Sequence, residues 1–135
     1  MALFEWSDDY SVKVPSIDQQ HKKLVGMLNE LHDGMMGGAG TAHLEGVLSG
    51  LIDYTAYHFA HEEELFATHG YPQAEEHTAE HKALVGQVVD YKRKFDAGEV
   101  SLNMELMMFL KDWLIKHILG SDKAYSGHLV ERQVQ

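Results

Sequence analysis

Seven side chains of types that bind metal ions recur along the sequence at spacings typical of helices. They are five histidines and two carboxylates: His21, His58, Glu62, His77, His81, His117 and Asp122. Side chains four residues apart lie on one face of an α-helix, so both members of the pairs at 58/62 and 77/81 can reach a single ion. The chain has no cysteine, which excludes thiolate sites. The pattern predicts a metal site that helices build from imidazole and carboxylate groups.

Four segments of helical length carry these residues, separated by glycine clusters and by Pro72. The predicted helices cover residues 18–36, 41–68, 73–96 and 102–119. Ser16 is the expected N-cap of the first helix, with Gln19 at capping-box spacing, and Thr41 is the expected N-cap of the second.

The connections between these segments are short, which favours antiparallel neighbours. We therefore expect an all-α fold, an up-down-up-down antiparallel four-helix bundle that forms one domain over residues 1–135. Residues 1–17 contain Phe4, Trp6 and Tyr10 and lack a helical pattern. They should form an aromatic N-terminal arm that packs across the bundle. Residues 122–135 are expected to be a short, mostly polar C-terminal tail.

The apolar seams of the predicted helices include the ligand candidates, which should therefore face the bundle axis. Glu62 lies on such a seam, where an ionised carboxylate is costly unless a metal or a cation pairs with it. No Lys or Arg lies on these seams. His61 steps off the seam and is not expected to be a ligand. The other histidines are expected to be structural or surface residues: His32, His43, His69 and His128.

Asp122 follows His117 by five residues, which is a poor spacing for a shared helix face. At about 100° per residue the two side chains lie roughly 140° apart around an ideal α-helix. They share a face only if the helix is overwound, bulged or ended between them. Gly120 and Ser121 favour such a departure.

Charge and hydropathy restrict the partners. The formal net charge is −10, and no basic stripe follows any segment, so we expect no nucleic-acid binding. Residues 1–10 lack the charge and apolar run of a secretory signal, and the longest apolar run elsewhere is 106–110. We expect a cytoplasmic protein with no membrane insertion.

Seven ligands are more than one octahedral ion can bind, so the set favours two ions, and imidazole with carboxylate suits iron. If Glu62 and Asp122 each bridge two irons, and a solvent-derived oxygen bridges them too, a single coordination position stays open. A small ligand would bind there. Phe59 follows His58, and Trp113, Leu114 and Ile118 surround His117, so the surroundings of that position should be apolar.

From Trp6 to Tyr125 the sequence resembles the hemerythrin family, specifically its single-domain bacterial members. The motifs that carry the resemblance are residues 17–21 (IDQQH), 58–62 (HFAHE), 69–72 (HGYP), 76–81 (EHTAEH), 113–118 (WLIKHI) and 122–123 (DK). The resemblance implies a four-helix bundle with a non-haem di-iron centre that binds O2 reversibly.

The resemblance also implies a role for each candidate. One iron would be held by His77, His81 and His117, the iron with the open position by His21 and His58, and both would be bridged by Glu62 and Asp122. The residues implied around bound O2 are Phe59, Trp113, Leu114, Ile118 and Tyr125. The expected function is O2 storage, transport or delivery rather than enzymatic catalysis, with an oxygen-consuming protein as a candidate acceptor.

Other functions remain open at this point. Residues 77–81 also fit the H-x-x-E-H pattern of inverzincin metalloproteases, with Glu80 as general base, although that pattern leaves the other ligands unexplained. A di-iron oxidase would usually carry four carboxylates and two histidines, a more negative ligand set than this one. A module that senses O2, nitric oxide or iron, or that handles iron, is a third alternative.

Overall fold

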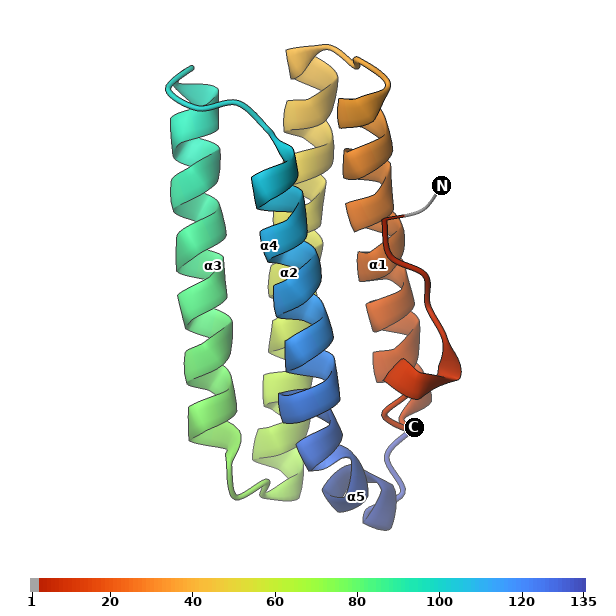
Figure 1. Ribbon diagram of the computed structural model, residues 1–135. Coiled ribbons are helices and arrows are strands. Elements are labelled where there is room, and N and C mark those ends of the chain that lie inside the picture. Colours follow the sequence, from red (N-terminus) through yellow and green to blue (C-terminus); the bar gives the residue numbers. More distant parts are fainter. Residues whose placement is uncertain (1–2) are drawn as a thin grey trace.

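The computed structural model describes residues 3–135 as an antiparallel bundle of four long helices, with no β-strand in that part of the chain (Figure 1). The helices run up, down, up and down, as predicted: α1 (Pro15–Met36), α2 (Thr41–His69), α3 (Ala74–Asp96) and α4 (Met104–Lys116). No helix in the described residues is long and apolar enough to cross a membrane.

Two predicted N-caps differ from those in the structure. α1 begins at Pro15, with Val14 as N-cap, so Ser16 lies inside the helix and does not cap it. Proline suits the first position of a helix because its φ is already helical and its missing N–H needs no partner. Gly40, not Thr41, is the N-cap of α2. α2 ends at His69 and is capped by Gly70, whose φ of 64° is left-handed and therefore favours glycine.

The largest difference lies at the C-terminus, where we expected a polar tail over residues 122–135. After α4 the chain forms a π-helical segment, His117–Asp122, hereafter the π turn, and continues as α5 (Lys123–Glu131). Tyr125 and Leu129 lie four residues apart on α5 and are buried. This apolar pair anchors α5 under the bundle, and Ser126 Oγ donates a hydrogen bond to the carbonyl of Val12, 2.5 Å away.

Residues 3–14 run along the outside of the bundle beside α1 and contain a short 3₁₀ turn, Asp8–Tyr10 (Figure 1). The arm is fixed at two places. The backbone N–H of Phe4 donates to Asn29 Oδ1 at 2.9 Å, and Asn29 Nδ2 donates to the Phe4 carbonyl at 2.8 Å. Nearer to α1, the backbone N–H of Val12 donates to Asp18 Oδ1 at 2.9 Å.

Two apolar clusters fill the interior. The large core contains Leu24, Leu28, Leu31, Leu48, Leu51, Phe59, Leu84, Val88, Phe95, Leu106, Met107 and Leu110. The small core contains Val12, Val14, Ile17, Phe66, Tyr71, Tyr125 and Leu129. On α1, His21 comes between Ile17 of the small core and Leu24 of the large core, and on α2, Glu62 comes between Phe59 of the large core and Phe66 of the small core. The metal-ligating side chains therefore lie where the two cores meet.

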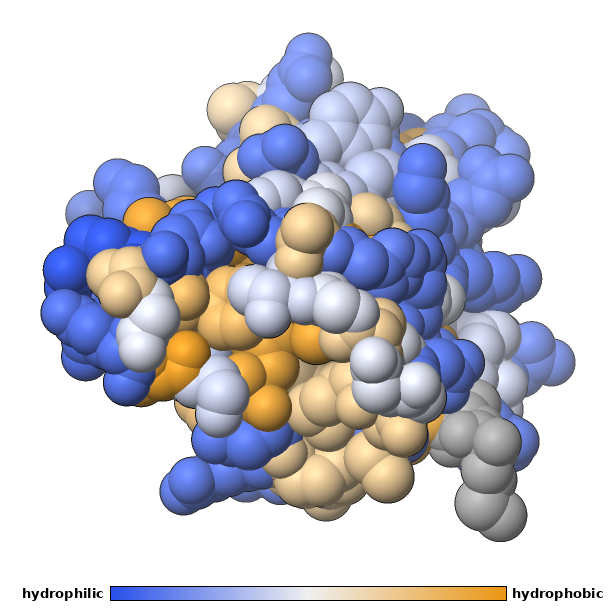
Figure 2. Space-filling model, turned by 90° about the horizontal axis from the view of Figure 1, so that it is seen from above, coloured by the Kyte–Doolittle hydropathy of each residue, from blue (hydrophilic) through white to orange (hydrophobic). Residues whose placement is uncertain are grey.

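The large core extends toward the end of the bundle where α1 joins α2 and α3 joins α4. Figure 2 looks down on this end and shows apolar surface gathered among hydrophilic side chains. Met36, at the end of α1, is 65% exposed, and Met104, at the start of α4, is 42% exposed. The candidate ligands lie toward the opposite end, where α5 closes the bundle (Figure 1).

Candidate metal centre

The structure brings all seven candidate ligands together. α1 supplies His21, α2 supplies His58 and Glu62, α3 supplies His77 and His81, and the π turn supplies His117 and Asp122. Each of the seven residues is at most 4% exposed. The convergence of side chains from four elements follows from helix phase, because each ligand lies on the inward face of its helix.

Within residues 3–135 the ligand atoms form two overlapping groups, each with atoms no more than 4.8 Å apart. One group contains Glu62, His77, His81, His117 and Asp122, and the other contains His21, His58, Glu62 and Asp122. The two carboxylates belong to both groups, whereas every histidine belongs to one. This is the arrangement of two adjacent sites with three and two histidines, joined by two shared carboxylates.

Asp122 faces both groups with different oxygens. Its Oδ2 lies 3.0 Å from His21 Nε2, while its Oδ1 lies 3.0 Å from His77 Nε2 and 3.1 Å from His117 Nε2. One carboxylate oxygen is thus directed to each group.

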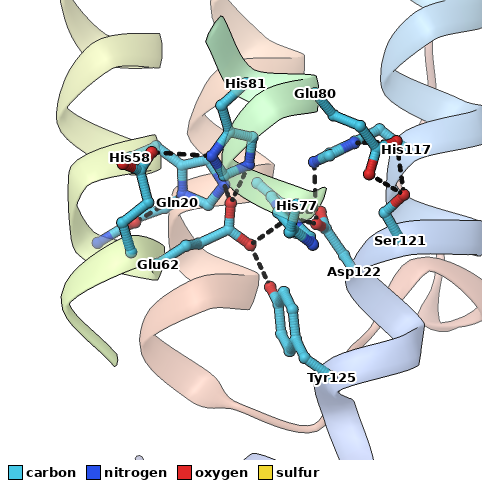
Figure 3. Close-up of polar contacts among 12 residues, drawn as sticks. Gln20, His58, Glu62, His77, Glu80, His81, His117, Ser121, Asp122 and Tyr125 are labelled. Atoms are coloured by element: carbon cyan, nitrogen blue, oxygen red, sulfur yellow. Dashed lines mark hydrogen bonds and ion pairs between the residues drawn. The ribbon is translucent and has the colours of Figure 1, made fainter. Parts of the chain in front are cut away.

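Glu62 also spans the two groups (Figure 3). Its Oε1 lies 3.1 Å from His58 Nε2 and 3.3 Å from His81 Nε2, which belong to different groups. Its Oε2 lies 4.0 Å from His77 Nε2 and accepts a hydrogen bond from the hydroxyl of Tyr125. Tyr125 therefore fixes the bridging carboxylate from the side of the small core.

Several buried nitrogen and oxygen atoms of this cluster have no hydrogen-bond partner, as expected of atoms that bind a metal. The Nε2 atoms of His58, His77, His81 and His117 have no hydrogen-bond partner in the described chain. Glu62 Oε1 and both oxygens of Asp122 lack one as well. Such orphaned groups are costly in a protein interior, and cations at the centre of the cluster would satisfy all of them. The residues present thus fit two bound metal ions.

Both carboxylates stay ionised despite complete burial. Burial and the charge of Asp122 raise the pKa of Glu62, but the imidazoles of His58 and His81 outweigh both and lower this pKa to about 2. Burial also raises the pKa of Asp122, whereas close contacts with His117, His21 and His77 hold it well below its usual value. Metal ligands bind in the deprotonated state, so the two carboxylates are ready to bind cations.

The π turn explains how Asp122 joins His117 in the cluster. In π-helical geometry backbone hydrogen bonds connect residues i and i+5, the spacing of His117 and Asp122. The extra residue per turn brings the two side chains to one face. Of the departures expected from the sequence, a bulged helix is the one that occurs.

Aromatic rings cover the three-histidine group. Phe59 stacks on His81, with ring centroids 3.7 Å apart, and Trp113 stacks on His117 at 4.3 Å. Phe59, Trp113 and Leu114 also line an apolar cavity of about 60 Å³ that extends into the large core. Three of the five residues predicted to surround O2 therefore border one small apolar space.

Ile118 and Tyr125, the other two residues predicted around O2, lie outside this cavity. Ile118 is fully buried, and Tyr125 packs in the small core with its hydroxyl on Glu62. The cavity borders three of the five residues, and all five remain the predicted surroundings of O2. Their contact with O2 stays a prediction.

The remaining histidines lie outside both groups, as expected. His61 Nε2 is 3.1 Å from Ser16 Oγ, and His128 Nε2 is 2.7 Å from the carbonyl of His69. Glu80, the general base of the protease alternative, is also outside the groups and accepts a hydrogen bond from Ser121 at 2.8 Å.

Two polar contacts escaped the sequence reasoning. Gln20 Oε1 lies 2.7 Å from His58 Nδ1, and Glu63 Oε2 lies 3.0 Å from His81 Nδ1. Both contacts join different helices, so spacing along the chain does not reveal them. The available signal is only that Gln20 and Glu63 adjoin ligand positions in the sequence.

Comparison with known proteins agrees with the geometry. Residues 12–129 match the family model described as the hemerythrin HHE cation binding domain. A bacteriohemerythrin of Stenotrophomonas maltophilia is 40% identical over 96% of this chain and 83% of its own, and one of Methylococcus capsulatus is 39% identical over 93% of this chain and 95% of its own. A crystal structure of a wild-type hemerythrin superposes with a TM-score of 0.89 at 38% identity, covering 95% of this chain and 98% of its own. The chain belongs to the hemerythrin family.

Proposed function

We propose that this protein binds O2 reversibly at a non-haem di-iron centre. The observation that carries the proposal is the pair of overlapping, buried ligand groups that share Glu62 and Asp122. Imidazole and carboxylate together suit iron, and facing helices of a bundle are a common support for two metal ions. Membership of the hemerythrin family supports the same conclusion.

The two groups assign the ligands. We propose that His77, His81 and His117 would hold one iron and that His21 and His58 would hold the other, with Glu62 and Asp122 available to both. The site with two histidines would offer its iron fewer protein ligands, so O2 would bind at that site. Bound iron supplies the electrons that O2 needs in order to bind reversibly.

The surrounding side chains keep water from the centre. Phe59 and Trp113 lie flat against ligand imidazoles, and Leu114 borders the same apolar cavity. An apolar cavity of about 60 Å³ suits a small uncharged molecule better than an ion, because an ion would lose its hydration without gaining polar partners. The cavity therefore favours entry of O2 over entry of hydrated anions.

The ligand set favours binding over oxidation of a substrate. Di-iron sites that activate oxygen commonly carry about four carboxylates. Here five imidazoles, which bring no negative charge, accompany two carboxylates, so less negative charge is available to support iron in high oxidation states. We therefore propose a carrier or store of O2 rather than an oxidase.

Metal analysis and absorption spectroscopy test the proposal directly. The purified protein should contain two irons per chain, and a charge-transfer band should appear with O2 and disappear on deoxygenation. A protein that holds one zinc and no iron would contradict the proposal. So would a di-iron protein whose spectrum is the same with and without O2.

A further inference from the structure

The Nδ1 atoms of the ligand histidines meet different partners in the two halves of the centre. In the two-histidine group, His58 Nδ1 lies 2.7 Å from the amide oxygen of Gln20, which is buried on α1. In the three-histidine group, His81 Nδ1 lies 3.0 Å from a carboxylate oxygen of Glu63 on α2. An oxygen acceptor requires a proton on Nδ1, which leaves the Nε2 lone pair free for a metal.

A second carboxylate lies on the same side as Glu63. Glu80 Oε1 is 3.8 Å from His117 Nδ1, and Ser121 Oγ holds Glu80 by donating to its carboxylate at 2.8 Å (Figure 3). His21, in the two-histidine group, has no hydrogen-bond partner at Nδ1 among the described residues. Both outer carboxylates thus back the three-histidine group, and the other group has one neutral amide.

We infer that Glu63 and Gln20 are positioning residues that make the two metal sites unequal in binding strength. The inference rests on the di-iron site proposed above. A carboxylate behind an imidazole makes the ring more basic and fixes its orientation, so His81 becomes a stronger donor. Gln20 fixes the orientation of His58 without adding charge. The metal affinity of the three-histidine site should therefore be higher than three histidines without the Glu63 contact would provide.

This inequality suits the proposed chemistry. The three-histidine site benefits from strong donors, because they would retain its metal while O2 binds to and leaves the other site. The site with the open position benefits from a weaker neutral set, which leaves that metal able to accept a further ligand. The distribution of Glu63 and Gln20 follows this division.

Binding of Co2+ to the metal-free protein tests the inference without relying on O2. We expect two Co2+ per chain, bound in two steps, followed by visible absorption. Glu63→Ala should weaken one step by about 10–100-fold, the usual cost of losing such a partner, and leave the other unchanged. Glu63→Gln retains an acceptor but not the charge, so its loss should be smaller than that of Glu63→Ala.

Glu64→Ala is the matched control, because Glu64 is the next residue on α2, carries the same charge and is exposed. It should leave both steps unchanged. The exchange Glu63→Gln with Gln20→Glu moves the charge to the two-histidine site. This double variant should bring the two binding constants closer together or reverse their order. Circular dichroism and thermal unfolding of each metal-free variant show that it is folded.

The results separate this inference from the proposed function. If the parent protein binds two Co2+ but Glu63→Ala titrates like Glu64→Ala, the inference is wrong and the di-iron site stands. If the parent binds fewer than two, both fail. If Glu63→Ala does not fold, Glu63→Gln and the charge exchange decide: unchanged constants in both would overturn the inference, and the predicted shifts would support it.

Discussion

Replacing Glu62 should remove iron from the protein, whereas replacing its neighbour His61 should leave the iron in place and lower the free energy of unfolding slightly. Glu62 is fully buried, and one of its oxygens lies within 3.3 Å of an imidazole from each metal group. His61 is partly buried and contacts Ser16 Oγ at 3.1 Å, away from both groups. The two residues therefore form a matched pair on one turn of α2.

The structure gives the size of each effect. Glu62→Ala removes a protein ligand from both metals at once, so each site should lose at least the roughly 100-fold in affinity that marks the upper cost of losing an outer-shell partner. His61→Ala removes one hydrogen bond, worth about 0.5–1.5 kcal/mol of the free energy of unfolding. It removes no ligand, so iron content should not change.

Two measurements on the same preparations separate these effects. Iron per chain is determined after identical reconstitution and desalting, and the free energy of unfolding of the metal-free proteins is determined in urea. Glu62→Ala should retain little iron, while His61→Ala should retain two irons and unfold at a slightly lower urea concentration. Equal iron loss in both variants, or two irons in Glu62→Ala, would refute the conclusion that Glu62, and not His61, faces the metal site from α2.

Three further perturbations probe the cavity, the arm and the metal. Leu114→Ala enlarges the apolar cavity of about 60 Å³ without touching a ligand, so iron content should stay constant. Autoxidation, followed by absorbance, should become faster. An unchanged rate would mean that Leu114 is an ordinary core residue with no role in the O2 pocket. Asn29→Ala removes both hydrogen bonds to the Phe4 backbone and should lower the free energy of unfolding by about 1–3 kcal/mol, measured in urea, with iron content unchanged. Removal of iron by chelation should lower the melting temperature, because Glu62 and Asp122 would remain buried together without a cation. Adding iron back should restore the melting temperature. Equal melting temperatures of the iron-loaded and iron-free proteins would mean that the metal contributes nothing to stability.

The fold class and the convergence of the candidate ligands followed from sequence because both depend on helical periodicity. Leu51, His58 and Glu62 lie on one face of α2, and once that face is known to be apolar its polar members must also point inward. The same periodicity separated Glu62 from His61. Helix phase is therefore enough to predict which side chains face the bundle axis, without any tertiary information.

Contacts between helices were not predictable in the same way. The pairing of Glu63 with His81 depends on how α2 and α3 are aligned along their axes, which periodicity does not specify. Tyr125 illustrates a different failure. Its spacing of four residues from Leu129 was a signal for a further helix, but Gly120 and Ser121 indicated a helix end before it.

The feature that misled the prediction of the C-terminus also completes the metal centre. Had α4 continued as a regular α-helix, Asp122 would point roughly 140° away from His117, and no side chain on that helix would bridge the two groups. Had the helix ended at Gly120, Tyr125 would not have been carried beneath Glu62. The π turn avoids both outcomes, because its wider turn aligns His117 with Asp122 and lets the helix continue into α5. The irregular segment is therefore what allows one stretch of chain to supply a histidine ligand, the second shared carboxylate and the hydroxyl that fixes the first.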